Sequence, residues 1–125
     1  MARIMIVDDS PTLRASAQFT LEAEGHSVIQ ADNGVSALSA LESLSSAEAD
    51  ELRMIITDIN MPEMDGITFI RKVKESPFKY VPVLVMTTES QDDMKTEGKN
   101  AGAAGWLVKP FKPEQLNSVV QRFVT

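Results

Sequence analysis

Short apolar runs alternate with segments of helical periodicity along the whole chain. Most of these runs are continuously apolar, which is typical of strands buried on both faces of a parallel sheet. The pattern predicts five strands, at residues 4–7, 27–30, 54–57, 83–86 and 106–108.

Helix signals occupy the intervals between the predicted strands. Ser10 followed by Pro11 predicts an N-cap and a first helical turn, and Gly25 predicts where that helix ends. Apolar residues at helical spacing mark the second, third and last helices, at positions 38, 41 and 44, at 67, 70 and 73, and at 116, 119, 120 and 123. The second helix, marked by positions 38, 41 and 44, follows the turn at Asn33-Gly34.

Two segments carry weaker signals. Residues 91–101 are highly charged and contain Gly98, with Met94 as their one large apolar side chain, so we expect a helix that packs poorly and is mobile. Residues 45–51 are polar and predict a loop. The regular alternation predicts a doubly wound α/β fold with right-handed crossovers, a five-stranded parallel sheet and five helices. We expect one domain over residues 1–125, with no output domain after the last helix.

Composition narrows the function classes. The 125 residues are 43% hydrophobic and include no cysteine, so a buried core is expected while disulfides, thiolate metal sites and cysteine nucleophiles are excluded. No stretch has the length and character of a signal peptide or a membrane span, so we expect a soluble, cytoplasmic protein. The net charge of −6 argues against sequence-independent nucleic-acid binding.

Polar residues stand where the predicted strands end. Asp8 and Asp9 follow the first strand, Asp58 the third, Thr87 the fourth and Lys109 the fifth. Each has an ordinary explanation when taken singly, as a cap, a turn former, a strand threonine or a surface lysine. In an open parallel sheet, however, ligands bind outside the carboxyl ends of the strands. One shared site therefore explains the set better than separate structural roles do.

The chemistry of this set favours a hard cation. Clustered carboxylates repel one another unless a cation lies between them, and the one histidine, His26, is distant in the sequence. Oxygen ligands without cysteine suit magnesium, which takes one or two carboxylates, keeps several waters and shares a phosphate. The backbone carbonyl of Asn60 is a further candidate ligand.

Ordered motifs across the chain carry a family resemblance. They are VDDS at 7–10, TDINMP at 57–62, MDG at 64–66, MTTE at 86–89 and AGAAGWLVKPF at 101–111. Together they resemble the receiver domain of bacterial two-component response regulators, and within it the free-standing, chemotaxis-type, CheY-like regulators. The resemblance implies a flavodoxin-like sheet with strand order 2-1-3-4-5.

The resemblance also implies roles for the site residues. Asp58 is the expected phosphoacceptor, and Mg2+ is expected on Asp9, Asp58 and the Asn60 carbonyl, with Asp8 acting largely through a bound water. Thr87 and Lys109 are expected to contact the phosphoryl oxygens. The bond between Lys109 and the following proline is expected to be cis.

Three further residues bear on the subclass. Asn60 and Glu89 resemble the residues that set the dephosphorylation rate in CheY-type proteins. Trp106 stands where the family usually has Tyr or Phe as a rotating switch; the alternative interpretation is a core aromatic. The charged helix at 91–101 departs from CheY and puts a motor-binding surface of the same kind in question.

The implied function is phosphoryl transfer from a CheA-like sensor histidine kinase, or a histidine-phosphotransfer protein, to a monomeric regulator. Its target would be a partner such as a flagellar motor switch protein, without nucleic acid or membrane. A relay intermediate or phosphate sink is the alternative within the family. A haloacid-dehalogenase-like phosphatase is less favoured, since such enzymes place a second acid where this chain has Asn60. A flavodoxin-like cofactor binder lacks its phosphate loop here.

Overall fold

The chain forms a three-layer α/β domain in the computed structural model, which describes residues 2–88 and 92–124 without the side chains of residues 92–95. Within these residues the strands are β1 (Arg3–Val7), β2 (Ser27–Ala31), β3 (Leu52–Asp58), β4 (Val83–Thr88) and β5 (Gly105–Lys109). The helices are α1 (Pro11–Ala23), α2 (Gly34–Glu42), α3 (Ser46–Glu51), α4 (Gly66–Lys74), α5 (Asp92–Ala101) and α6 (Pro113–Val124).

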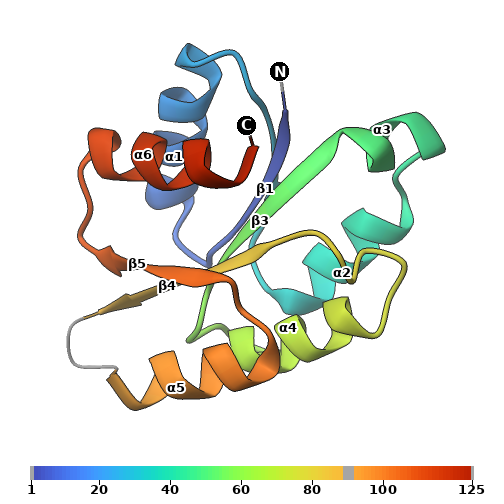
Figure 1. Ribbon diagram of the computed structural model, residues 1–125, viewed down its shortest axis with the longest axis vertical. Helices are drawn as coiled ribbons and strands as arrows, with labels where there is room; N and C mark the ends of the chain where they lie inside the picture. Colours follow the sequence, from blue (N-terminus) through green and yellow to red (C-terminus); the bar gives the residue numbers. More distant parts are fainter. Residues whose placement is uncertain (1, 89–91, 125) are drawn as a thin grey trace.

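The sheet is parallel throughout, with strand order β2-β1-β3-β4-β5. Figure 1 shows α1 and α6 together on one side of it and α2, α4 and α5 on the other. The predicted fold class and strand order are therefore confirmed. Each strand begins or ends beyond its predicted bounds, which is the usual error of boundary prediction. No helix in the described part of the chain is long and apolar enough to cross a membrane.

The continuous apolar runs are explained by two cores, one on each face of the sheet. In β1, Ile4 and Ile6 belong to the core beneath α1 and α6, whereas Met5 and Val7 belong to the core beneath α2 and α4. The same alternation holds in β3 and β4. Successive side chains of a strand point to opposite faces. In a strand covered on both sides, nearly every side chain is therefore buried in one of the two cores. Polar residues are thereby displaced to the strand ends.

Most predicted helix ends are confirmed by their caps. The Ser10 hydroxyl accepts the Leu13 N–H at 3.2 Å, with proline at the first helical position, and α1 ends before Gly25, whose φ is +89°. Asn33 caps α2 in the same manner. Leu44, predicted to lie in α2, follows the end of that helix and packs against the core from there.

The predicted loop at 45–51 is wrong, because α3 occupies it and raises the number of described helices from five to six. The Ser45 hydroxyl accepts the Glu48 N–H at 3.2 Å, and the Glu48 carboxylate accepts the Ser45 N–H at 3.0 Å. This capping box satisfies both donors at once and supports a six-residue helix that has no buried residue.

The weakly predicted helix α5 exists and contacts α4 and β4. Its described part approaches the sheet through small residues: Gly98 is buried, and Ala101 is 8% exposed. A methyl group at Gly98 would lie 3.4 Å from Val85 and 3.7 Å from Ile67, which is ordinary contact distance. Close backbone approach thus takes the place of large apolar side chains here. The predicted mobility of this helix stays a prediction.

A tight connection follows β3 and fixes the start of α4. The Gly66 N–H donates to the Ile59 carbonyl at 2.7 Å, and a Cβ at Gly66 would lie 2.2 Å from the Asp58 carbonyl oxygen and 2.8 Å from the Ile59 Cα. Those neighbours are backbone atoms at the end of a central strand and cannot give way independently. Glycine at position 66 is therefore required by this packing.

We expect Gly66→Ala to destabilise the fold by about 2 kcal/mol, because the added methyl group overlaps the backbone of β3. The matched control is Gly98→Ala, which also adds one methyl group to a buried helical glycine but meets side chains at contact distance. The control should be neutral or slightly stabilising. Urea denaturation at constant slope measures both, and equal losses would contradict the assigned packing.

Candidate functional site

The site is built at the carboxyl edge of the sheet, where three strands end together. Asp8 directly follows β1, and its N–H donates to the Ala31 carbonyl of β2 at 3.1 Å. Asp58 is the last residue of β3 and Lys109 the last of β5. The sheet register therefore aims side chains from separate parts of the chain at one place.

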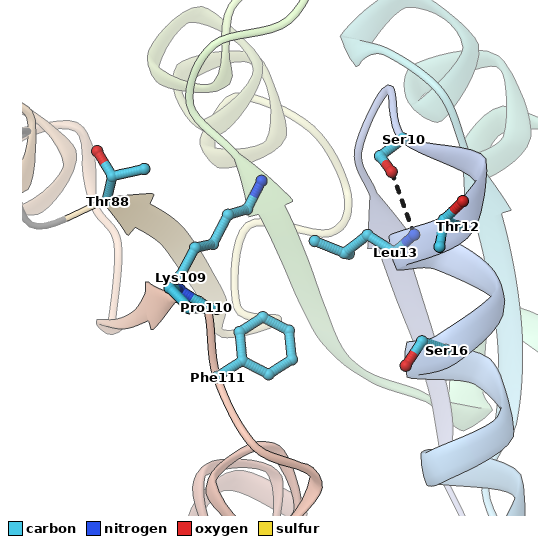
Figure 2. A pocket seen from close by; sticks show the side chains of 8 residues that line it. All are labelled: Ser10, Thr12, Leu13, Ser16, Thr88, Lys109, Pro110 and Phe111. Atoms are coloured by element: carbon cyan, nitrogen blue, oxygen red, sulfur yellow. Dashed lines mark hydrogen bonds between the residues drawn. The ribbon is translucent and has the colours of Figure 1, made fainter.

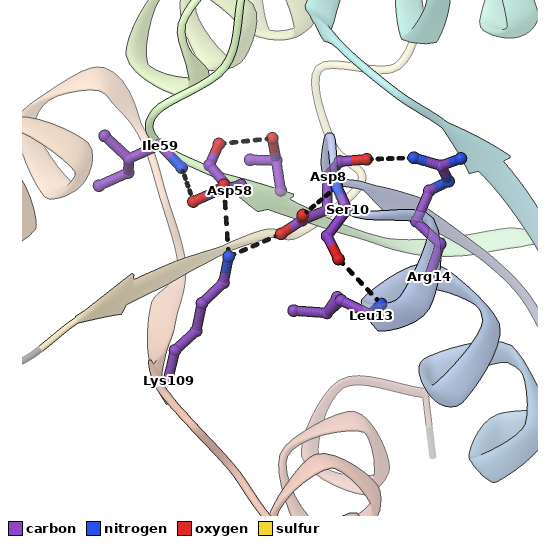
Figure 3. A network of polar contacts seen from close by, with 8 residues as sticks. Asp8, Ser10, Leu13, Arg14, Asp58, Ile59 and Lys109 are labelled. Carbon is purple, nitrogen blue, oxygen red and sulfur yellow. Dashed lines mark hydrogen bonds and ion pairs between the residues drawn. The ribbon is translucent and has the colours of Figure 1, made fainter.

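The carboxylates of Asp8, Asp9 and Asp58 lie close together, each offering an oxygen within 4.8 Å of the others. The Lys109 ammonium joins two of them, with Nζ 2.7 Å from Asp8 Oδ2 and 3.3 Å from Asp58 Oδ2 (Figure 3). The structure thus brings together four of the residues predicted from the strand ends.

Burial shapes the electrostatics of this cluster. Asp8 is 0% and Asp58 8% exposed, whereas Asp9 is exposed. Burial raises the pKa of Asp58 above its ordinary 3.8; the Lys109 charge opposes this rise and the Asp8 charge adds to it. For Lys109, burial acts to lower the pKa, but its hydrogen bond to Asp8 and the charge of Asp58 outweigh burial and raise it. Lys109 is therefore held as a cation between the carboxylates.

The donor set fits a hard divalent cation. Both Asp8 oxygens have protein partners, the Ser10 N–H at 2.8 Å and Lys109 at 2.7 Å. Asp58 Oδ1 accepts the Ile59 N–H at 2.8 Å. Within the described residues the Asp9 carboxylate has no hydrogen bond or ion pair. Three carboxylates against one ammonium leave two negative charges, and all the offered ligand atoms are oxygens, as magnesium prefers.

Asn60 lies two residues beyond Asp58 and is exposed. The role of its backbone carbonyl as a ligand stays a prediction. Glu89, which the sequence also singled out, lies outside the described residues.

Thr87 is fully buried near the end of β4, and its hydroxyl has no hydrogen-bond partner among the residues that the structure describes. A buried hydroxyl without a partner costs free energy, which marks this position as unusual.

Trp106 of β5 is 43% exposed, so the alternative of a core aromatic is wrong. The peptide bond between Lys109 and Pro110 is cis, as expected.

A hollow of about 530 Å³ opens beside Lys109, between the start of α1 and the segment after β5 (Figure 2). Its lining is mostly apolar and hydroxylic: Ser10, Thr12, Leu13, Ser16, Thr88, Lys109, Pro110 and Phe111. Lys109 belongs both to the lining of the hollow and to the carboxylate cluster, so the hollow borders the site at this residue.

Sequence reasoning missed the residues that act through backbone atoms. The Arg14 guanidinium donates to the Asp8 carbonyl at 2.7 Å, and Gly66 packs on the Asp58 carbonyl. Every residue has a backbone carbonyl, so a contact with one does not require a particular residue type in the sequence. The available signal was the glycine itself, placed directly after the acidic cap of α4.

A parallel sheet with this strand order, bearing clustered aspartates and a lysine at its carboxyl edge, defines a receiver-type α/β domain. Residues 4–121 match the family described as response regulator receiver domain, and the chain belongs to that family.

Several relatives of similar length are named as chemotaxis proteins. Chemotaxis protein CheY1 of Helicobacter pylori strain 26695 is 36% identical over 121 residues, covering 95% of this chain and 94% of its own. Protein PilH of Pseudomonas aeruginosa is 36% identical over 117 residues, covering 93% and 92%. The solved structure of chemotaxis protein CheY4 from Vibrio cholerae superimposes with a TM-score of 0.88 at 40% identity, covering 99% of each chain.

We expect Asp58→Asn to raise the melting temperature at neutral pH without added metal. The raised pKa means that the folded state binds the proton more tightly than the unfolded chain, so stability is lost as the pH rises from 3.8 through the folded pKa. The amide removes that cost, while Lys109 keeps Asp8 as its partner. Calorimetry should show a gain of a few degrees at pH 7 that shrinks toward pH 4. A variant that melts below the wild type at pH 7 would contradict this electrostatic account.

Proposed function

We propose that this protein is a stand-alone response regulator that accepts a phosphoryl group on Asp58, assisted by Mg2+, and changes its affinity for a partner. The observation that carries the proposal is the cluster itself. Three carboxylates from two strand ends lie within 4.8 Å of one another, with the Lys109 ammonium 3.3 Å from Asp58. Membership of the receiver-domain family supports the same reading.

Phosphoryl transfer asks the protein mainly for position and charge neutralisation. Asp58 is positioned by the end of β3 and by the Ile59 N–H on its Oδ1. An Asp58 oxygen attacks phosphorus on a phosphohistidine of the kinase, the P–O bond forms as the P–N bond breaks, and the imidazole departs. Lys109 stays within reach of the incoming oxygens and offsets their charge.

Asp9 and Asp58 would hold the magnesium ion, with Asp8 behind them because both of its oxygens already have protein partners. When bound, the ion supplies charge neutralisation to the phosphoryl oxygens. The acyl phosphate of Asp58 is later cleaved by water, which releases inorganic phosphate and restores the carboxylate. The cycle is self-directed, and we propose no turnover of an external substrate.

The response is proposed to pass through Thr87 and Trp106. A phosphoryl group brings three acceptor oxygens, and the buried Thr87 hydroxyl lacks an acceptor among the described residues. Movement of Thr87 toward the phosphoryl group vacates space that the half-exposed Trp106 can enter. The affected face, formed by α5, β5 and α6, is then the surface that partners read.

The biological setting is proposed from the relatives. Similarity to proteins named for chemotaxis favours a CheA-like kinase as donor and a motor-switch-type target, in the cytoplasm, with the regulator acting as a monomer. The hollow beside Lys109 is the proposed approach for the phosphodonor.

We expect Asp58→Asn to abolish acid-labile phosphate uptake from acetyl phosphate in the presence of Mg2+, because the amide is not a nucleophile at this position. Asp32→Asn is the matched control. Asp32 also follows a strand at the same edge, but its carboxylate accepts the Ser36 hydroxyl, 2.6 Å away, and is exposed. The control should incorporate phosphate like the wild type, measured by radiolabel or mass spectrometry.

Retained labelling in Asp58→Asn would place the phosphoacceptor elsewhere. Steady release of phosphate from p-nitrophenyl phosphate by the wild type would instead favour a phosphatase.

Thr87→Ala should take up phosphate almost as well as the wild type but fail to transmit it, because the missing hydroxyl is needed for the response and not for nucleophilic attack. Beryllofluoride with Mg2+ should change the fluorescence of Trp106 in the wild type and not in Thr87→Ala. Thr87→Ser, which keeps the hydroxyl, should restore most of the change. An equal fluorescence response in Thr87→Ala would remove Thr87 from the coupling.

A further inference from the structure

Asp9 is the exposed member of the acidic cluster and the one without a side-chain partner in the described part of the chain. A carboxylate that no other side chain contacts is positioned only by the backbone that carries it. The peptide that carries Asp9 begins at the carbonyl of Asp8, so whatever fixes that carbonyl also fixes where the Asp9 carboxylate can reach.

We propose that Arg14 is a positioning residue for the magnesium site, acting on the peptide between Asp8 and Asp9; this rests on the proposed Mg2+-dependent function. Figure 3 shows the Arg14 guanidinium directed at the Asp8 backbone oxygen. Its Nη1 donates to that oxygen at 2.7 Å, and its Nε donates to Gln30 Oε1 of β2 at 2.9 Å. Two contacts on a planar group restrict its position and its orientation together.

Gln30, the second residue that Arg14 contacts, is itself held by a hydrogen bond. The Gln30 amide donates to Gln18 Oε1, and the Gln18 amide donates to Glu22 Oε2 at 3.1 Å. The network therefore runs along α1 and joins it to β2 across the end of β1. Arg14 is the residue of this network that contacts the site.

The contact answers a structural need. Asp8 is 0% exposed, and a buried carbonyl at the end of a strand requires a donor. The position is otherwise unfavourable for a cation, because Arg14 is the fourth residue of α1 and lies near its positive end. Helix stability does not explain an arginine here, whereas anchoring the Asp8–Asp9 peptide does.

Positioning and simple electrostatics predict opposite effects of removing this arginine. Loss of a positive charge near the carboxylates should strengthen the binding of a cation. Loss of an outer support for a ligand should weaken it, typically by about tenfold or more. The sign of the change therefore decides between the two.

The experiment measures the Mg2+ dissociation constant by isothermal titration calorimetry on the intact chain, and the Mg2+-dependent rise in melting temperature as an independent readout. Arg14→Met, which keeps length but has no donor and no charge, should weaken Mg2+ binding by about tenfold. Arg14→Lys keeps the positive charge and an N–H donor group but not the planar pair of contacts, so it should recover part of the loss. Gln30→Ala, which removes the brace and leaves the arginine, should give a smaller loss than Arg14→Met.

Arg53→Met is the charge-matched control. It removes the same positive charge from an exposed residue of β3, at the opposite end of that strand from Asp58, and should leave the dissociation constant almost unchanged. Arg14→Met binding Mg2+ as tightly as the wild type, or more tightly, would overturn the positioning role. Failure of the wild type itself to bind Mg2+ would instead overturn the proposed function.

Discussion

The bridge from Lys109 to Asp8 and Asp58 is the interaction on which the site depends. Two carboxylates that are 0% and 8% exposed cannot share an edge of the sheet without a positive charge between them. The Lys109 ammonium lies 2.7 Å from the Asp8 carboxylate and 3.3 Å from the Asp58 carboxylate. It stays charged because these two carboxylates raise its pKa. It neutralises one charge of the cluster, and the remaining negative charge is what suits the site to a divalent cation.

The fold and the site follow from the same constraint. Strands covered on both faces leave little room for charged side chains along their length, so charged residues gather where the strands end. Parallel pairing then collects those ends at one edge. The close packing of Gly66 on the Asp58 carbonyl, and the hydrogen bond from its N–H to the Ile59 carbonyl, fix the backbone at the end of β3 that carries the Asp58 side chain. Precision at Asp58 thus derives from backbone packing and not from the aspartate itself.

Sequence reasoning succeeded where a pattern is repeated and failed where a single contact decides. Buried strands, the cap at Ser10 and the gathering of acids at strand ends all leave periodic or positional marks. The helix α3 was missed because it has no apolar face, although Ser45 and Glu48 stand at capping-box spacing. Arg14 was missed for a different reason: its partner is a backbone carbonyl, and every residue has one.

The buried hydroxyl of Thr87 links the energetics of the fold to the proposed response. The Thr87 hydroxyl has no partner among the described residues, and a buried polar group in that situation costs roughly 1–3 kcal/mol. An acceptor near Asp58 would relieve this cost in the proposed response. Since each 1.4 kcal/mol changes an equilibrium constant about tenfold, that single new hydrogen bond can shift a two-state population by about one to two orders of magnitude. A switch of ordinary strength therefore needs no large rearrangement. The proposed response requires one acceptor at the edge of the sheet and a second position for the Trp106 side chain.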